Sequence, residues 1–587
     1  MASTQAQKSD RLRCTIIGAG VSGILMAYKL KQHLNDFVDF QIFEKSPEIG
    51  GTCYASSQEI QAYLKGVVKH FDLERYITFN TKVESARWSE EAGAWTIELN
   101  DGTLVTSEVL VNAGGILNHP QLPNVEGLST FSGPMLHTAS WDSSIDLRGK
   151  RIGVIGAGAS AIQLVPSIQP LVKDMKVFIR TPSWIAPPVA LPDSNATNYR
   201  YSSEEKKSFE GQKDMYLNTR KGLEDQFNGM FRIFLKSSDE QRNIRNLFES
   251  RMKQLIPDKK LQDKLIPQFE TGCRRINPGE GFLTALQKPN VEPIFDTIQK
   301  VTPNGIVAGD KEYPADILVA ATGFNTTFRP RFPIIGRNGV NLQAFWQDDP
   351  ASYLGVGVAG FPNYLIFLGP NTPISNGSLM GSVEATADYF IRLLHKMIRQ
   401  RVKSFEVRSD AQEDFNNHTQ TAMKDMVWTG ACRSWYKQGA NGKVTGIWAG
   451  SSLHYIQVLS EDRWEDYEWE HKSERYSYWG HGSSWIEEPE LDPLGARRQD
   501  MLEAMTTIPK TDSDLSFYLW KSDPLPDGCI PDVGLNKTTK GEEEDGPEFT
   551  WAEGLPKDVG SGHLNGSAAA AAGIDTHVNG GVISVPV

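Results

Sequence analysis

The feature of this sequence that most constrains its fold is a glycine-rich fingerprint that occurs twice, each time after a short apolar run. The first copy places Gly18, Gly20 and Gly23 in the spacing Gly-x-Gly-x-x-Gly, between a strand-like run and a helical pattern. The first glycine permits a tight turn, the second lets the backbone approach a pyrophosphate, and the third lets the helix pack closely on the strand. The pyrophosphate then meets the positive end of the helix. This order of elements predicts a dinucleotide site, and a glycine turn without a ligand is the minor alternative.

An acidic residue supports this first site. A second predicted strand, residues 40–43, ends at Glu44, which follows Gly23 by 21 residues. A carboxylate in that position is placed to hydrogen-bond a ribose hydroxyl of the nucleotide. The strand, the helix and the acid together are much more specific than the glycines alone.

The second fingerprint follows another strand-like run, residues 151–155. It contains Gly156, Gly158, Ser160 and Ala161, so that an alanine stands where the first copy has its third glycine. Alanine at that position is an accepted variant of the motif. The sequence therefore predicts a second dinucleotide site.

The residues after the next predicted strand indicate which nucleotide the second site takes. That strand, residues 176–179, leads to Arg180 and Thr181 rather than to an acid. A guanidinium can bind the 2′-phosphate of NADP bidentately, whereas a carboxylate would repel it. The second site is therefore predicted to bind NADP. Taken alone, a solvated surface arginine is a serious alternative for Arg180.

Two such sites predict an α/β fold with two Rossmann-like domains that hold FAD and NADPH, a pair of cofactors that exchange a hydride. No C-x-x-C pair is present, which removes the redox partner that a disulfide reductase needs. An amphipathic pattern predicts a helix over 384–402. The predicted parts are a first FAD-binding part at 1–145, an NADP-binding domain at 146–325 with a helical insertion at about 200–270, a second FAD-binding part with a C-terminal layer at 326–535, and a disordered tail at 536–587.

Composition narrows the possible partners and the compartment. Lysine and arginine number 60 against 72 acidic residues, a formal charge of −12, which argues against a protein that mainly grips nucleic acid or an anionic membrane. The polar residues 1–13 contain no apolar signal region, and no run reaches the length of a membrane span. The five cysteines are odd in number and lack metal-site spacing, so we expect no disulfide framework, no zinc site and a cytoplasmic location.

A segment between the two fingerprints indicates a family. Residues 131–142 read Phe-Ser-Gly-Pro-Met-Leu-His-Thr-Ala-Ser-Trp-Asp, which resembles the F-x-G-x-x-x-H-T-x-x-W-[PD] signature of Baeyer–Villiger monooxygenases. Flavin-containing monooxygenases carry a related motif, usually with a different aromatic in place of Trp141. Further matches lie at 321–324, 369–372 and 434–436. The resemblance extends from about residue 13 to 525 and is closest to the fungal branch found with secondary-metabolite pathways.

The resemblance implies a mechanism and several site residues. NADPH would reduce FAD, the reduced flavin would react with O2, and the resulting anionic peroxide would attack a ketone to give an ester or lactone. Arg275 matches the family's catalytic arginine, and Arg274 matches a cation near the 2′-phosphate. Trp435 matches a tryptophan of a mobile loop over the nicotinamide cofactor, and His137 matches a structural or gating histidine. Without the family, an Arg-Arg pair would more often be a solvated loop.

The chain departs from the family pattern after Gly51 and Thr52, which are predicted to contact the flavin cofactor. The family continues with an aromatic residue and a loop that includes a Tyr-Pro-Gly and a Cys-Asp pair, whereas this chain passes from Cys53 directly into residues 54–59. The lost aspartate would pair with Arg275 in the family, and a buried guanidinium without its partner is costly. A truncated version, rescue by another acid and poor oxygenation all remain open. The alternatives to ketone oxygenation are S- or N-oxygenation and a catalytically silent FAD- and NADP-binding protein.

Overall fold

The structure is a computed structural model of the chain. It describes residues 11–50, 57–187, 201–374, 377–438, 442–479 and 482–483. The predicted flavin contacts Gly51 and Thr52 lie outside these ranges, as does the predicted tail at 536–587. Within the described ranges, no helix is both long and apolar enough to cross a membrane.

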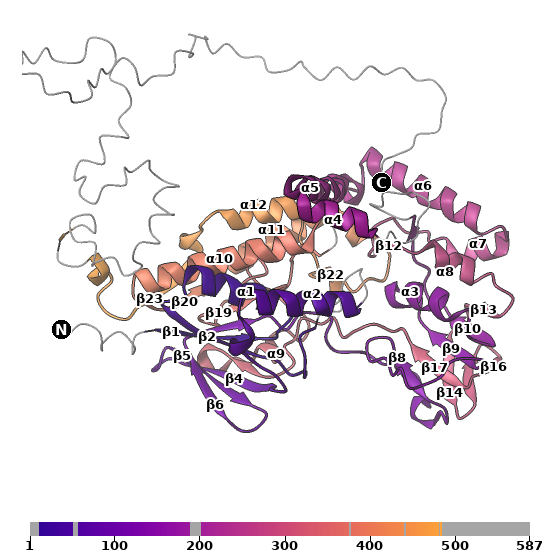
Figure 1. The fold of residues 1–587 in the computed structure, drawn as a ribbon, viewed down its shortest axis with the longest axis horizontal. Coiled ribbons are helices and arrows are strands. Elements are labelled where there is room, and N and C mark those ends of the chain that lie inside the picture. The colour runs from indigo at the N-terminus through magenta and orange to yellow at the C-terminus, as the bar shows by residue number, and fades with distance from the viewer. Residues whose placement is uncertain are drawn as a thin grey trace, which may run out of the picture. The chain divides into compact units, whose positions relative to one another are not determined.

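The first Rossmann-like sheet has five parallel strands in the order β19-β7-β1-β2-β3. Five of the six residues of β1 are buried, as expected for a parallel sheet that is covered on both faces. Helix α1 (Val21–His33) packs against α10 (Leu379–Arg399), and the two lie beside this sheet in Figure 1. The strands are β1 (Leu12–Ile17), β2 (Val38–Phe43), β3 (Ile77–Thr78), β7 (Val109–Asn112) and β19 (Tyr364–Ile366).

The second Rossmann-like sheet also has five parallel strands, in the order β13-β10-β9-β17-β8. Helices α3 (Ala159–Ile168) and α8 (Glu280–Ala285) pack against each other in the same core. The strands are β8 (Met135–His137), β9 (Arg151–Ile155), β10 (Asp174–Phe178), β13 (Val291–Ile294) and β17 (Ile317–Ala320). The predicted α/β fold with two Rossmann-like units is therefore confirmed.

Helices dominate the segment between β11 (Ile185–Ala186) and β12 (Asn277–Pro278). The first of them begins at a capping box, because the Ser202 hydroxyl accepts a hydrogen bond from the Glu205 backbone and the Glu205 carboxylate accepts one from Ser202. Ser238 caps the third helix in a similar way with its hydroxyl. The helices are α4 (Ser203–Gly211), α5 (Lys213–Gly229), α6 (Asp239–Leu255) and α7 (Lys259–Leu265).

The remaining regular elements form smaller sheets and peripheral helices. The four-stranded sheet has the order β18-β4-β5-β6, and β5 turns into β6 through Asn100-Asp101-Gly102. The helices are α2 (Ser57–His70), α9 (Leu342–Phe345), α11 (Ser409–Met423) and α12 (Ser452–Ser460). The strands are β4 (Val83–Ser89), β5 (Ala94–Leu99), β6 (Leu104–Ser107), β14 (Ile298–Thr302), β15 (Gly305–Ala308), β16 (Lys311–Pro314), β18 (Ile334–Ile335), β20 (Val402–Val407), β21 (Lys437–Gln438), β22 (Lys443–Val444) and β23 (Tyr467–His471).

The predicted helix at 384–402 is shifted in the structure. Helix α10 begins at Leu379, five residues earlier, and ends at Arg399. Arg401 has a φ of +51°, a left-handed conformation that stops a helix, and Val402 starts β20. Amphipathic spacing identified the buried face of the helix but carried no information on this backbone break.

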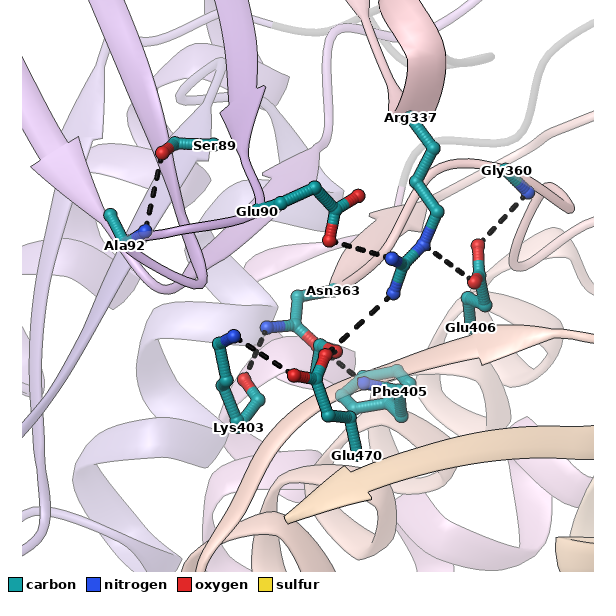
Figure 2. A network of polar contacts seen from close by, with 11 residues as sticks. Ser89, Glu90, Ala92, Arg337, Gly360, Asn363, Lys403, Phe405, Glu406 and Glu470 are labelled. Carbon is teal, nitrogen blue, oxygen red and sulfur yellow. Dashed lines mark hydrogen bonds and ion pairs between the residues drawn. The ribbon is translucent and has the colours of Figure 1, made fainter. Parts of the chain in front are cut away.

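An arginine attaches the four-stranded sheet to the C-terminal strand pair β20–β23. Arg337 contacts Glu90 at 2.6 Å, Glu406 at 2.7 Å and Glu470 at 3.9 Å, as Figure 2 shows. Lys403 forms a further ion pair with Glu470 at 2.9 Å. Segments more than 300 residues apart in the sequence are thus held together by one guanidinium and its carboxylates.

Candidate active site

The first glycine loop has the backbone that its motif predicts. Gly18 has a φ of +102°, and a Cβ there would lie 2.8 Å from the carbonyl oxygen of Ala113. A Cβ on Gly23 would lie 1.9 Å from the carbonyl oxygen of Gly18, so that only glycine permits this close approach of helix to strand. A Cβ on Gly20 would meet only the Gly50 oxygen, at 3.6 Å. The second glycine is therefore the one that leaves room for a ligand, as a bound pyrophosphate requires.

The Glu44 carboxylate lies against this loop. One oxygen accepts a hydrogen bond from the backbone N–H of Ala19 at 2.8 Å, and the other accepts one from Ser46 at 2.8 Å. A carboxylate held in this way at the end of β2 is placed to meet a ribose hydroxyl. The described residues of the loop therefore fit the adenosine part of FAD.

The second glycine loop repeats this geometry. Gly156 has a φ of +122°, and a Cβ there would lie 2.5 Å from the carbonyl oxygen of Ala321. Gly158 precedes α3, and a Cβ built on it would have no atom within 4 Å. Ala161 is fully buried in the sheet core, whereas Ser160 in the first turn of α3 is partly exposed. The open side of Gly158 at a helix N-terminus fits a pyrophosphate.

Two arginines that are 94 residues apart in the sequence lie in the same region beside the second loop. Arg180 follows β10 and is exposed, and Arg274 is half-buried and donates a hydrogen bond to the carbonyl oxygen of Pro182 at 3.1 Å. The pKa of Arg274 is lowered, mainly by burial and further by the charge of Arg180. Within the described residues, neither guanidinium has a carboxylate within 4 Å. Paired cations without an acid fit a phosphate group, and Thr181 stands between Arg180 and Pro182.

Arg275 and Trp435 approach the same region from two segments. The Arg275 side chain is exposed, and it forms no ion pair with any residue of the described ranges. Trp435 is half-buried, with its ring 4.8 Å from that of the buried Tyr436. The phenol of Tyr436 also acts electrostatically on Arg274. The structure thus brings Arg274 and the Trp435 loop together, and Arg275 follows Arg274 directly.

His137 ends β8 and lies against one of the segments that join the two Rossmann-like units. Its Nδ1 accepts a hydrogen bond from the backbone N–H of Ala139 at 3.0 Å, and its ring meets Phe324 edge-on at 6.3 Å. Burial lowers the pKa of His137, and the backbone at Gly323 and Gln121 opposes this shift. A neutral imidazole that accepts from the backbone suits a positioning role better than proton transfer.

The number and spacing of the cysteines predicted no disulfide framework, yet the structure contains a disulfide. Cys273 and Cys432 form a disulfide, with Cα atoms 6.2 Å apart and a separation of 159 positions in the sequence. Both side chains are buried. Spacing in the sequence gave no signal, because the two segments meet only in the folded chain. Cys273 directly precedes Arg274, and Cys432 lies three residues before Trp435, so the bond ties these two segments together.

Sequence reasoning also missed Gln438, which connects the Trp435 loop to the segment that follows β17. Its side-chain N–H donates to the carbonyl oxygens of Thr326 and Trp435, both at 3.1 Å. Lys437 donates to the carbonyl oxygen of Cys432 at 2.9 Å in the same loop. No pattern in the sequence marks either side chain, because both act on backbone carbonyls.

Comparisons with known proteins agree with this geometry. A family model described as flavin-binding monooxygenase-like matches residues 52–191, and one for an NAD(P)-binding Rossmann-like domain matches 16–74. The FAD-binding monooxygenase tazF of Aspergillus terreus is 36% identical over 528 residues, 83% of this chain and 94% of that protein. A Baeyer–Villiger monooxygenase of Pseudomonas aeruginosa is 32% identical over 488 residues, 77% of this chain and 91% of that protein.

Solved structures extend the likeness to the fold. Cyclohexanone monooxygenase from Rhodococcus sp. Phi1, crystallised with NADP+, matches with a TM-score of 0.69 and 26% identity, over 78% of this chain and all of that one. The two glycine loops, the acid-free arginine pair and relatives above 30% identity over most of the chain lead to one assignment. The chain belongs to the family of FAD-binding, NADPH-dependent Baeyer–Villiger monooxygenases.

Proposed function

We propose that this enzyme inserts one atom of O2 between the carbonyl carbon and a neighbouring carbon of a polyketide, terpenoid or steroid-like ketone. NADPH supplies two electrons, the second oxygen atom leaves as water, and the product is an ester or a lactone. The site residues would act within this reaction as set out below.

The observation that carries the proposal is how the two nucleotide loops are joined. Gly18 lies against Ala113, which begins the first joining segment where the chain leaves β7. Gly156 lies against Ala321, which begins the second joining segment where the chain leaves β17. The two segments then pair, because Gln121 donates to the carbonyl oxygen of Gly323 at 3.0 Å. A backbone bridge between Pro120 and Phe324 continues this pairing. Paired segments that start at the two loops support a site in which the two cofactors exchange a hydride.

The flavin, when bound, supplies the reduction of O2 and the oxygen atom that is transferred. We assign to Arg275 the role of stabilising negative charge on that oxygen and on the substrate oxygen after attack. A guanidinium suits this role because it stays protonated and donates in a planar fork. Its exposed position, with no ion pair to a described residue, leaves its charge available for an anion.

Arg180, Thr181 and Arg274 would hold the 2′-phosphate of NADPH. The backbone of the second glycine loop, with Ser160, would hold the pyrophosphate, and Trp435 would cover the nicotinamide end. We assign His137 to positioning the joining segment through Phe324. Gly51 and Thr52 keep their predicted flavin contact as a proposal, since they lie outside the described residues.

Two other activities need to be distinguished experimentally from ketone oxygenation. S- or N-oxygenation uses the same two cofactors but a soft nucleophile as substrate. A silent FAD- and NADP-binding protein is suggested by the short connection after Thr52. Access of water through a shortened loop would favour release of hydrogen peroxide over product.

The deciding experiment offers the purified flavoprotein a panel of cyclic and steroid ketones, with thioethers, NADPH and ¹⁸O2. We expect ketone-dependent NADPH oxidation and one labelled oxygen in an ester or lactone. In Arg275→Ala, product formation should fall about 10²- to 10³-fold, the loss typical of removing one group that stabilises an oxyanion. Flavin reduction by NADPH should persist, because Arg275 has no role in that step.

A matched control is Arg148→Ala, which removes an exposed arginine paired with Asp146 and should leave all rates as they are. Labelled sulfoxide without labelled ester would favour S-oxygenation. Bound flavin that oxidises NADPH to hydrogen peroxide with every substrate would support the silent protein. Undiminished product in Arg275→Ala would refute the role of Arg275.

We also propose that the substrate is a small molecule, with no nucleic acid partner, and that the enzyme works in the cytoplasm. The acidic balance of 72 carboxylates against 60 cations supports the first point. The disulfide counts against the second point, because disulfides are rare in cytosolic proteins, although burial of both cysteines limits their exchange with thiols. Fluorescence of the tagged full chain in its host would test the location.

A further inference from the structure

A cavity of about 270 Å³ opens beside the paired joining segments and belongs to none of the nucleotide loops. Its walls come mainly from residues that follow the second joining segment, together with one from the first and one from α9. The polar side chains that line it are His119, Asn325, Thr327, Arg329, Arg331 and Gln343. All six carry hydrogen-bonding groups, and two are cations.

The two arginines are fixed by carbonyl oxygens and not by acids. Nε of Arg329 donates to the carbonyl oxygen of Gln343 at 2.9 Å, and an Nη of Arg331 donates to that of Asn325. The Gln343 amide donates a hydrogen bond to the carbonyl oxygen of Pro330 at 2.9 Å, which ties the segment 329–331 to α9. Each guanidinium carries five N–H donors. Within the described residues, neither forms an ion pair.

The cavity contains two positive charges and no described carboxylate that pairs with them. The pKa of Arg331 is lowered, chiefly by burial and further by the charge of Arg329. Like charges that share a cavity repel each other, and an anion placed between them would remove that cost. A carboxylate is the smallest organic group whose two oxygens match the guanidinium fork.

The cavity wall continues into the segments that contact His137 and the Trp435 loop. Asn325 donates its backbone N–H to the carbonyl oxygen of His119 at 2.9 Å, so the wall is part of the paired segments. The preceding residue, Phe324, contacts the ring of His137. The following residue, Thr326, accepts from Gln438, which also binds the backbone of Trp435. The cavity is thus connected through its own wall to the contacts of His137 and of the Trp435 loop.

We propose that Arg329 and Arg331 bind a carboxylate of the ketone substrate, so that the enzyme prefers keto acids over neutral ketones. This inference rests on the proposed function, because it names the class of ketone. The carboxylate takes no part in bond making and serves only to orient the carbonyl. A free organic acid that acts as an effector has the same chemistry, so the test must separate the two sources.

The test compares 4-oxocyclohexanecarboxylate with its methyl ester in the native flavoprotein and in R329Q/R331Q. Native enzyme should show a KM at least 10-fold lower for the acid, and the ratio should fall to about one in the double variant. R148Q, which removes an arginine outside the cavity, should keep the native ratio. Equal KM values in the native enzyme, or a ratio that survives in the double variant, would overturn the proposal.

Cyclohexanecarboxylate, which has no ketone, separates substrate from effector. If the pocket takes the substrate, this acid competes with the keto acid; stimulation of ester turnover without competition would overturn the substrate assignment. Calorimetric binding of this acid, lost in R329Q/R331Q, would support the pocket even if no ketone were oxidised, so the two proposals can fail separately. If the double glutamine variant does not fold, R329K/R331K keeps the charges and should weaken binding by losing the fork.

Discussion

Arg337 and Arg274 show two ways in which this chain uses a buried or half-buried guanidinium. Arg337 is surrounded by Glu90, Glu406 and Glu470, and it joins segments of the fold (Figure 2). The charge of Arg180 acts on Arg274, and among the described residues the Arg274 guanidinium donates to a backbone carbonyl and to no carboxylate. One guanidinium is paired with carboxylates of the chain, and the other forms no ion pair with any residue that the structure describes.

The contrast does not reflect a shortage of acids. The chain has 72 acidic residues and 60 lysines and arginines. An arginine without a nearby carboxylate therefore results from the local arrangement of the chain and not from its composition. An arginine that is paired with carboxylates, such as Arg337, stabilises the fold, whereas two arginines without a nearby acid, such as Arg180 and Arg274, repel each other, and an anion that bound them would raise stability. Because no carboxylate holds Arg274 in place, its segment needs another attachment to the fold. The disulfide between Cys273, the residue before Arg274, and Cys432 supplies that attachment.

The largest effect on stability is expected from removing this disulfide. In Cys273→Ser with Cys432→Ser, the loss of a 159-residue cross-link should lower the free energy of unfolding by up to about 5 kcal/mol on the chain-entropy account. The KM for NADPH should rise as well, because Arg274 loses its support. Urea unfolding and NADPH titration measure the two effects.

The matched control for this double variant is Cys14→Ala, which removes a buried thiol that is not bonded. It should cost about 1 kcal/mol, as a small core truncation does, and leave the KM alone. Mass analysis after alkylation without reductant should find Cys273 and Cys432 protected. Two alkylated thiols at these positions would contradict the disulfide itself.

The next effect comes from the arginine that is paired with carboxylates. Arg337→Met should lower the free energy of unfolding by about 2 to 3 kcal/mol, somewhat less than for a fully buried pair because Arg337 is 28% exposed. The KM for NADPH should not change, in contrast to variants of Arg274. A change in KM without a change in stability would reverse the distinction between the two arginines.

The pH dependence of this loss follows from Glu406. Burial raises its pKa and Arg337 opposes the rise, so that Arg337→Met should raise it further. A carboxyl with a raised pKa in the folded state contributes stability at low pH and loses that contribution as the pH rises. The cost of Arg337→Met should therefore be larger at pH 8 than at pH 5. In Glu406→Gln, which cannot ionise, this difference should shrink.

The sequence predicted the features that depend on residues close together in the chain, and it did not predict those that depend on contacts between distant segments. Gly18, Gly156 and Glu44 act through nearby backbone, so that their spacing alone predicted both Rossmann-like units and the loop geometry. The family resemblance added Arg274, which no local pattern marks as a partner of Arg180. The disulfide and the Arg329–Arg331 cavity depend on which distant segments meet, and spacing along the chain does not encode that.

The smallest effect, and the most direct test of the comparison, is expected at Arg180. Arg180→Ala should raise the KM for NADPH about 10- to 100-fold, as expected from losing one charge-assisted hydrogen bond of about 1.5–3 kcal/mol. The KM for NADH should hardly change, because NADH has no 2′-phosphate. Stability should stay the same or rise slightly, since the repulsion with Arg274 disappears. Equal increases for both nucleotides would show that the acid-free pair is not a phosphate site, and the contrast with Arg337 would then have no functional meaning.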